Sequence, residues 1–186
     1  MENKAVTSAL DIVNWFCRKA DTAGVMLEEA KIQHLLFLAQ IHFALKSGHF
    51  LMPSLFVCGR GGFYEPTIRQ IMRFGLPLMS KPSFDSSTDD FLELIWQKYA
   101  PRSEADLNRF ILSLECWKQS YRPETEVIVD PMRLADSFAD SIRNSRRDEP
   151  ASSSGIRLSQ NGPVRVSAWH PRKLKDSNKI KENTKK

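Results

Sequence analysis

Histidines and cysteines are the side chains of this 186-residue chain that could act as metal ligands, bases or nucleophiles. His34 and His42 lie eight positions apart, which on a helix is about 12 Å along the axis and too far to share one metal ion. We therefore expect structural or solvent-facing histidines. Cys17, Cys58 and Cys116 are widely spaced and form no CxxC pair, so the sequence predicts neither a disulfide framework nor a zinc site.

Nucleophilic and acid-base catalysis each require side chains that converge, and the sequence brings none together. No histidine lies near a cysteine in sequence; Cys58, close to Arg60, is the one thiol to test as a nucleophile, and Cys116 is typical of core packing. The acid pairs at 28–29 and 89–90 point to different helix faces and are explained as helix-start acids. We predict that the protein is not an enzyme, with no catalytic residue, cofactor or metal.

Residues 57–64, VCGRGGFY, could form a phosphate-binding loop or a turn. A P-loop needs a lysine and a serine or threonine after its glycines, and a GxGxxG loop needs a surrounding βαβ unit; the sequence has neither. We expect Gly59, Gly61 and Gly62 instead to allow positive φ angles and close backbone approach. This turn would lead from an extended segment into a helix beginning near Pro66.

The spacing of apolar residues predicts a mainly α fold: a single compact helical domain of about six helices with one short extended segment, followed by a disordered basic C-terminal tail. The expected helices cover residues 5–21, 28–46, 67–74, 88–100, 104–121 and 132–145, and the extended segment covers 50–58. Apolar residues surround the second helix between residues 32 and 45, which indicates that this helix is the centre of the domain. Aromatic residues at helical spacing are expected chiefly in the core.

The formal net charge of +5 is concentrated at one end of the chain. Residues 1–146 contain 17 Lys/Arg and 18 Asp/Glu, a net charge of −1, whereas residues 147–186 contain 10 and 4, a net charge of +6. The second range has too few apolar residues to offset the entropy of ordering it. We predict a helical domain over 1–146 and a disordered basic tail over 147–186, with at most a short extended contact near 164–169.

The N-terminal residues lack the order of a secretory signal, and no apolar run approaches the roughly 18 residues that cross a bilayer. We expect a cytoplasmic protein without a membrane partner.

The stretch AKIQHLLFLAQIHFALKSG, residues 30–48, resembles the signature helix of the Panacea domain, the SocA-like antitoxin family. The matching positions are Lys31, Gln33, Leu35, Leu36, Phe37, Ala39, Gln40 and Gly48. Residues 9–20 resemble the first helix of that family, and a later block matches at Trp96, Tyr99, Ser103, Leu107 and Trp117. Together the blocks cover about residues 5–121. The resemblance implies a helical, non-enzymatic domain that neutralises a cognate toxin by direct contact.

The middle of the chain departs from the family pattern. The frame keeps Gly61, Arg69 and Gly75, but Cys58, Arg60, Gly62 and Ile68 replace its usual Trp, Tyr, Pro and Tyr, and Ile111 and Leu112 stand where the family has Thr-His. We expect this altered loop to contribute to partner recognition. The predicted partner-binding residues are Arg60, Phe63, Tyr64 and Arg69, with the first three at least partly exposed. The alternative is that Phe63 and Tyr64 seal the core beneath the loop.

The first function predicted is therefore a non-enzymatic protein-binding module resembling a toxin-neutralising antitoxin, whose partner is a cognate toxin encoded nearby. The alternative is a helical scaffold whose basic tail binds nucleic acid without sequence specificity, or serves as a secretion or degradation signal.

Overall fold

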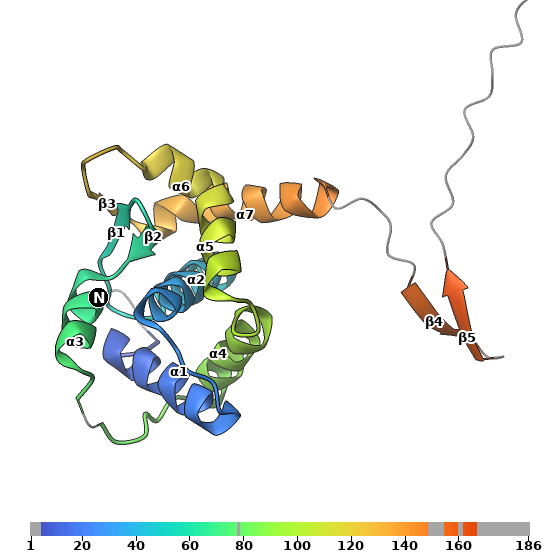
Figure 1. The fold of residues 1–186 in the computed structure, drawn as a ribbon, viewed down its shortest axis with the longest axis horizontal. Helices are drawn as coiled ribbons and strands as arrows, with labels where there is room; N and C mark the ends of the chain where they lie inside the picture. Colours follow the sequence, from blue (N-terminus) through green and yellow to red (C-terminus); the bar gives the residue numbers. More distant parts are fainter. Residues whose placement is uncertain (1–4, 78, 149–154, 160–161, 167–186) are drawn as a thin grey trace, which may run out of the picture. The chain divides into compact units, whose positions relative to one another are not determined.

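The computed structural model describes residues 5–77, 79–148, 155–159 and 162–166, in two compact units of residues 1–144 and 145–186. The first unit is mainly helical, with a small three-stranded antiparallel sheet (Figure 1). Its helices are α1 (Ala9–Ala23), α2 (Glu29–Ser47), α3 (Pro66–Phe74), α4 (Ser86–Tyr99), α5 (Glu104–Ser113), α6 (Glu115–Ser120) and α7 (Pro131–Asp148), the last of which runs into the second unit. Its strands are β1 (Phe56–Gly59), β2 (Gly62–Tyr64) and β3 (Val127–Val129). The predicted mainly α class is confirmed.

Helix α2 is the central element, as its apolar composition predicted. It packs against α1, α3, α4, α5 and β2, and it runs through the middle of the helices in Figure 1. Leu35, Leu36, Phe37 and Leu38 are all fully buried, so neighbours cover every side of this turn of the helix. Each such side chain contributes about 1.5–3 kcal/mol to folding through removal of apolar surface from water. Gly48 ends the helix in the left-handed conformation.

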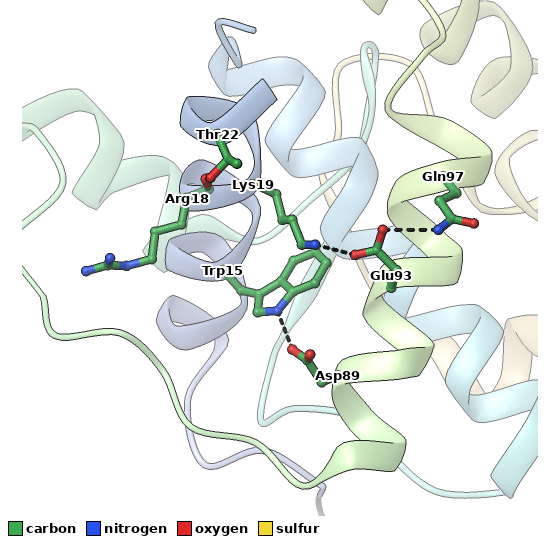
Figure 2. Close-up of polar contacts among 7 residues, drawn as sticks. All are labelled: Trp15, Arg18, Lys19, Thr22, Asp89, Glu93 and Gln97. Atoms are coloured by element: carbon green, nitrogen blue, oxygen red, sulfur yellow. Dashed lines mark hydrogen bonds and ion pairs between the residues drawn. The ribbon is translucent and has the colours of Figure 1, made fainter. Parts of the chain in front are cut away.

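Polar contacts fix α1 against α4 on the solvent side of the core (Figure 2). The indole Nε1 of Trp15 donates a hydrogen bond to Asp89 Oδ1 at 2.6 Å. Lys19 Nζ lies 2.5 Å from Glu93 Oε2 and 5.3 Å from the centre of the Trp15 ring. Gln97 donates a hydrogen bond to Glu93 from the next turn of α4. The acid at the start of α4 therefore has a structural role, because it satisfies the buried indole.

The Gly-Arg-Gly-Gly run is the turn of a β-hairpin, and it does not lead directly from an extended segment into a helix. Strand β1 pairs with β2 so that Gly59 lies opposite Gly62, and Arg60 and Gly61 form the loop. The other edge of β1 pairs with β3, which gives the strand order β2-β1-β3. The third strand comes from residues far along the chain. Local patterning could not reveal it, because a strand of three residues carries almost no periodic signal.

The predicted helix over 104–121 is two helices, and for this reason the domain has seven helices where six were expected. The break falls at Leu114, whose ψ of 136° is extended. The Leu114 side chain is buried, and the hydroxyl of Ser141 on α7 accepts a hydrogen bond from the Glu115 N–H at 2.9 Å. Tertiary contact thus replaces the helical hydrogen bond that Glu115 gives up.

The second unit contains an antiparallel pair, β4 (Gly155–Ser159) with β5 (Gly162–Val166). Of the range 147–186 that was predicted to be disordered, the structure describes residues 147–148, 155–159 and 162–166. The predicted disorder of the other residues, and the part of the predicted extended contact that involves residues 167–169, lie outside the described residues. For these residues both remain predictions. Within the described ranges, no helix has the length and apolar character that crossing a membrane requires.

Candidate functional site

All four predicted partner-binding residues line one hollow of about 420 Å³ between the β1–β2 hairpin and the first turns of α2. Its lining consists of Glu29, Ala30, Gln33, His34, Gly59, Arg60, Gly61, Gly62, Phe63, Tyr64, Arg69 and Glu126. Sequence reasoning found the hairpin and α3 side of the hollow. It missed the contribution of α2 and of Glu126, which is distant in sequence and arrives with β3.

The tip of the hairpin leaves Arg60 at the rim of the hollow. Arg60 is exposed, and its side chain has no hydrogen bond or ion pair with the described part of the chain. Gly62, with φ of 113°, adopts a conformation that other residues rarely take. A Cβ atom there would lie 3.1 Å from Ile111 Cγ2 and 3.2 Å from His34 Nε2. The hairpin therefore approaches α2 and α5 so closely that a side chain at position 62 would require Ile111 or His34 to shift. Of the three glycines expected to need positive φ, Gly62 alone does, since Gly59 and Gly61 have ordinary angles.

The predicted exposure of Phe63 is wrong. Phe63 is 1 % exposed, and its ring stacks on that of Phe37 with centroids 4.0 Å apart. Side chains alternate along a strand, and Phe63 lies opposite Cys58 on the face that packs against α2. Phe63 thus seals the core beneath the hairpin, as the alternative interpretation held, and it reaches the hollow only as part of its floor.

Tyr64 is half-buried on the opposite face of β2, which fits the predicted partial exposure. The guanidinium carbon of Arg69 lies 4.6 Å from the centre of its ring. A Cβ atom on Gly59 would lie 3.3 Å from the Tyr64 ring, so the ring also covers this glycine. Burial, followed by a hydrogen bond with Glu126, raises the pKa of Tyr64. The ring is therefore held from several directions, and the phenol stays protonated at neutral pH.

The hollow is lined by two acids, Glu29 and Glu126, and two arginines, Arg60 and Arg69, so its formal charges cancel. These four side chains differ in whether they have a partner. Arg69 Nε lies 3.7 Å from Glu29 Oε1, and both side chains are 39 % exposed, so this ion pair is weak. Glu126 interacts with the phenol of Tyr64. Arg60 is the cation of this set that lacks a described partner, which leaves its five N–H donors available to an incoming group.

His34 supports the hairpin loop from below. The imidazole is 3 % exposed, and its Nε2 lies 3.3 Å from the carbonyl oxygen of Gly61. A carbonyl oxygen only accepts, so Nε2 carries the proton and Nδ1 is a bare acceptor, buried without a partner among the described residues. Burial lowers the pKa of His34, although the bond to Gly61 opposes this effect. The expectation of a structural histidine is thus met.

Gln33 holds the segment that follows the hairpin. Its Oε1 accepts a hydrogen bond from Glu65 N at 2.8 Å, and its Nε2 donates to Glu65 O at 3.3 Å. The Glu65 carboxylate in turn accepts from Ile68 N and caps α3. One side chain of α2 therefore fixes where β2 ends and where the helix carrying Arg69 begins.

Cys58 and Cys116 are buried in the core, and the second helical histidine, His42, is partly buried beside it. Cys58 is fully buried, and burial raises its pKa to about 11, so the one thiol chosen for testing is held in the unreactive form. Burial raises the pKa of Cys116 to about 12. His42 lies 2.6 Å from the Tyr99 hydroxyl through Nε2, and burial lowers its pKa to about 4. In the ranges that the structure describes, no cluster of three or more His, Cys, Asp or Glu side chains could hold a metal ion.

The fold and this hollow define a small helical domain with a clamped β-hairpin at one edge. Comparison with known proteins adds no identification, because no family model, no curated protein and no solved structure matches the chain.

Proposed function

We propose that the chain is a non-enzymatic protein-binding module, which neutralises a cognate partner protein in the manner of the Panacea antitoxins that it resembles. The observation that carries this proposal is Arg60, an exposed guanidinium without a described partner at the rim of a hollow that Tyr64 and Arg69 also line. Arginine and tyrosine are, with tryptophan, the residue types enriched among the side chains that anchor protein interfaces.

The rigidity of the surroundings supports a binding role. The Gln33 clamp, the contact of His34 with Gly61 and the close approach of Gly62 hold the hairpin in one position. A preorganised surface loses less conformational entropy when a partner binds, so more of the contact energy appears as affinity.

Several positions that carry the Panacea resemblance have structural roles here. Lys31 Nζ donates to the carbonyl of Ala100 at the end of α4, and Gln40 accepts from Met52 N. Trp117 Nε1 donates to Gly59 O, which attaches α6 to the hairpin. These bonds supply a reason why the matching residue types would recur in proteins that share this arrangement, and in this way they support the resemblance.

The non-enzymatic part of the proposal rests on the state of Cys58, Cys116 and His42. Cys58 and Cys116 are buried with raised pKa values, and the imidazole of His42 is occupied by Tyr99. None of these groups lines the hollow at the hairpin.

Co-expression with the product of a short neighbouring reading frame tests the proposal. We expect the protein to relieve the toxicity of that product and to co-purify with it, and Arg60→Ala to weaken capture about tenfold or more, as loss of an anchor residue does. Arg109→Ala is the matched control, because this exposed arginine lies on α5 outside the hollow. A neighbour that stays lethal and forms no complex would exclude the antitoxin function, and equal capture by both variants would exclude the hairpin as the contact.

The charge distribution favours a second candidate function. The net charge of +6 in residues 147–186 could hold nucleic acid electrostatically, with affinity that falls steeply as salt rises. We expect the full chain to bind a DNA duplex at low salt and a chain ending at Asp148 to bind it much more weakly. Equal affinity of the two chains across a salt series would remove this alternative.

A further inference from the structure

The break between α5 and α6 runs against the local sequence. Residues 104–121 contain no glycine or proline, and their apolar spacing predicts one continuous helix. In such a helix the Glu115 N–H would donate to the carbonyl oxygen of Ile111, four residues earlier. The structure instead holds Leu114 in an extended conformation, with ψ of 136°. Positions where the local preference and the fold disagree are expected at functional or strained sites.

The start of α6 is capped by another helix. Leu114 is the N-cap residue of α6, and its side chain has no acceptor group. The preceding helix α5, by contrast, has its own N-cap, Ser103, whose hydroxyl accepts from the first turn. For α6 the acceptor is Ser141 of α7, whose Oγ lies 2.9 Å from Glu115 N. The Ser141 hydroxyl donates its own proton to the carbonyl oxygen of Ser137 at 3.0 Å, so towards α6 it serves as an acceptor.

α7 reaches this position through a small buried contact. Among residues 131–144 of α7, three are buried, and Phe138 is the largest of them. The Phe138 ring meets the His42 ring of α2 edge-on, with centroids 5.0 Å apart. Ser141 follows Phe138 by three positions, so the two side chains lie on the same side of the helix. Docking of Phe138 on α2 therefore brings Ser141 to the start of α6.

α6 in turn contacts the hairpin that carries Arg60. The indole Nε1 of Trp117 donates a hydrogen bond to Gly59 O at 3.1 Å, and Gly59 directly precedes Arg60. The Trp117 ring also stacks on Tyr121, with centroids 4.7 Å apart, which fixes the direction of the indole. A change of the Leu114 ψ from 136° to the helical value of about −42° would redirect α6 and withdraw the indole from Gly59.

We infer that α7 is a strap that positions the Arg60 hairpin: its docking sets the break at Leu114, and the indole of Trp117 transmits this position to Gly59. Ser141 and Trp117 are thus positioning residues. Because coupling between two sites is reciprocal, a partner bound at the hairpin also stabilises the docked α7. The strap itself is a property of the fold, and its effect on partner capture rests on the proposed function.

NMR of the full chain labelled with ¹³C and ¹⁵N tests the inference. Ser141→Ala removes the acceptor, so we expect the Glu115 amide to exchange with solvent about tenfold faster. We also expect the ¹³Cα shift of Leu114 to move towards helical values and the amides of residues 57–64 to exchange faster. The control is Ser137→Ala, which removes from the same helix a buried hydroxyl without a partner among the described residues. This variant should leave all three measurements unchanged.

Two further variants test the two ends of the strap. Phe138→Ala removes the anchor of α7 and is expected to produce the changes of Ser141→Ala to a larger extent. Its control is Phe91→Ala, which removes a buried ring of α4 that packs on Phe43. Trp117→Phe keeps an aromatic ring but removes the indole N–H, so it should speed exchange over residues 57–64 without moving the Leu114 shift.

The inference is overturned if Leu114 stays extended in both Ser141→Ala and Phe138→Ala, because burial of Leu114 itself would then hold the break. It is also overturned if exchange over residues 57–64 is unchanged in Trp117→Phe. If Phe138→Ala does not fold, the other two variants decide both points. These measurements need no partner, so failure of the antitoxin proposal leaves them intact. Where a partner is captured, Ser141→Ala should weaken capture relative to Ser137→Ala, and equal capture would overturn the effect of the strap on binding.

Discussion

Adjacent residues of the hairpin have opposite environments. Phe63 packs on Phe37 in the core, whereas Tyr64 lies on the outer face between Gly59 and Arg69. The alternation of side chains along β2 separates them, and a sequence interpretation that treated the segment as a loop assigned both to the surface. Arg60→Ala should therefore leave stability unchanged, while removal of the Tyr64 ring has a structural cost as well.

Alanine substitutions at the neighbouring residues Gly62 and Gly61 test the geometry of the hairpin turn, with Gly61 as the control. Gly62→Ala is expected to destabilise the protein by about 2 kcal/mol or more, since the positive φ is strained for alanine and its Cβ would press on Ile111 and His34. Gly61→Ala meets open space at an ordinary φ and should change stability by less than about 0.5 kcal/mol. Urea unfolding of the two variants measures this difference, and equal midpoints would contradict the close approach of the hairpin to α2.

At the scale of elements, α2 organises both the core and the candidate site. Its buried apolar residues hold the surrounding helices, and its buried polar residues Gln33 and His34 reach the hairpin. The apolar pattern predicted the first role. The contacts of Gln33 and His34 depend on where the hairpin lies relative to α2, and the local sequence pattern does not predict that position.

Gln33→Ala tests the clamp between α2 and the start of α3. The variant leaves the buried N–H of Glu65 without its acceptor, so we expect a loss of about 1–3 kcal/mol and faster hydrogen exchange of the Glu65 amide. The control is Gln97→Ala, which removes an exposed glutamine that bonds to Glu93 within α4. Unchanged exchange at Glu65 would mean that the β2–α3 junction is held by other contacts.

At the scale of the whole molecule, the partly buried His42 makes stability depend on pH. Its pKa is about 4 in the folded protein against an ordinary 6.5, so the unfolded chain binds more protons between these values. The stabilisation is complete above about pH 6.5 and is lost as the pH falls toward 4. From these pKa values, His42 alone should cost about 2 kcal/mol between pH 7.5 and pH 5.

Urea unfolding at the two pH values measures this loss, and a His42→Gln variant isolates the contribution. The variant should lose less stability on acidification than the parent protein by roughly that amount. Burial also lowers the pKa of His34, so part of the pH dependence is expected to remain. An identical decline in both proteins would show that His42 does not titrate in this range.

The sequence by itself determined the mainly α class and the centrality of α2, because these follow from the local spacing and density of apolar residues. It also determined the charge difference between residues 1–146 and 147–186, which is a property of composition. The tertiary structure decided the break at Leu114, the pairing of β3 with β1, and the burial of Phe63 beside the half-exposed Tyr64. Each of these depends on residues distant in sequence: Ser141 bonds to the start of α6, β3 arrives from beyond residue 126, and Phe37 receives the Phe63 ring. Local propensity carries no information about such partners, so the shape of the hollow at the hairpin could be recognised only once the chain was folded.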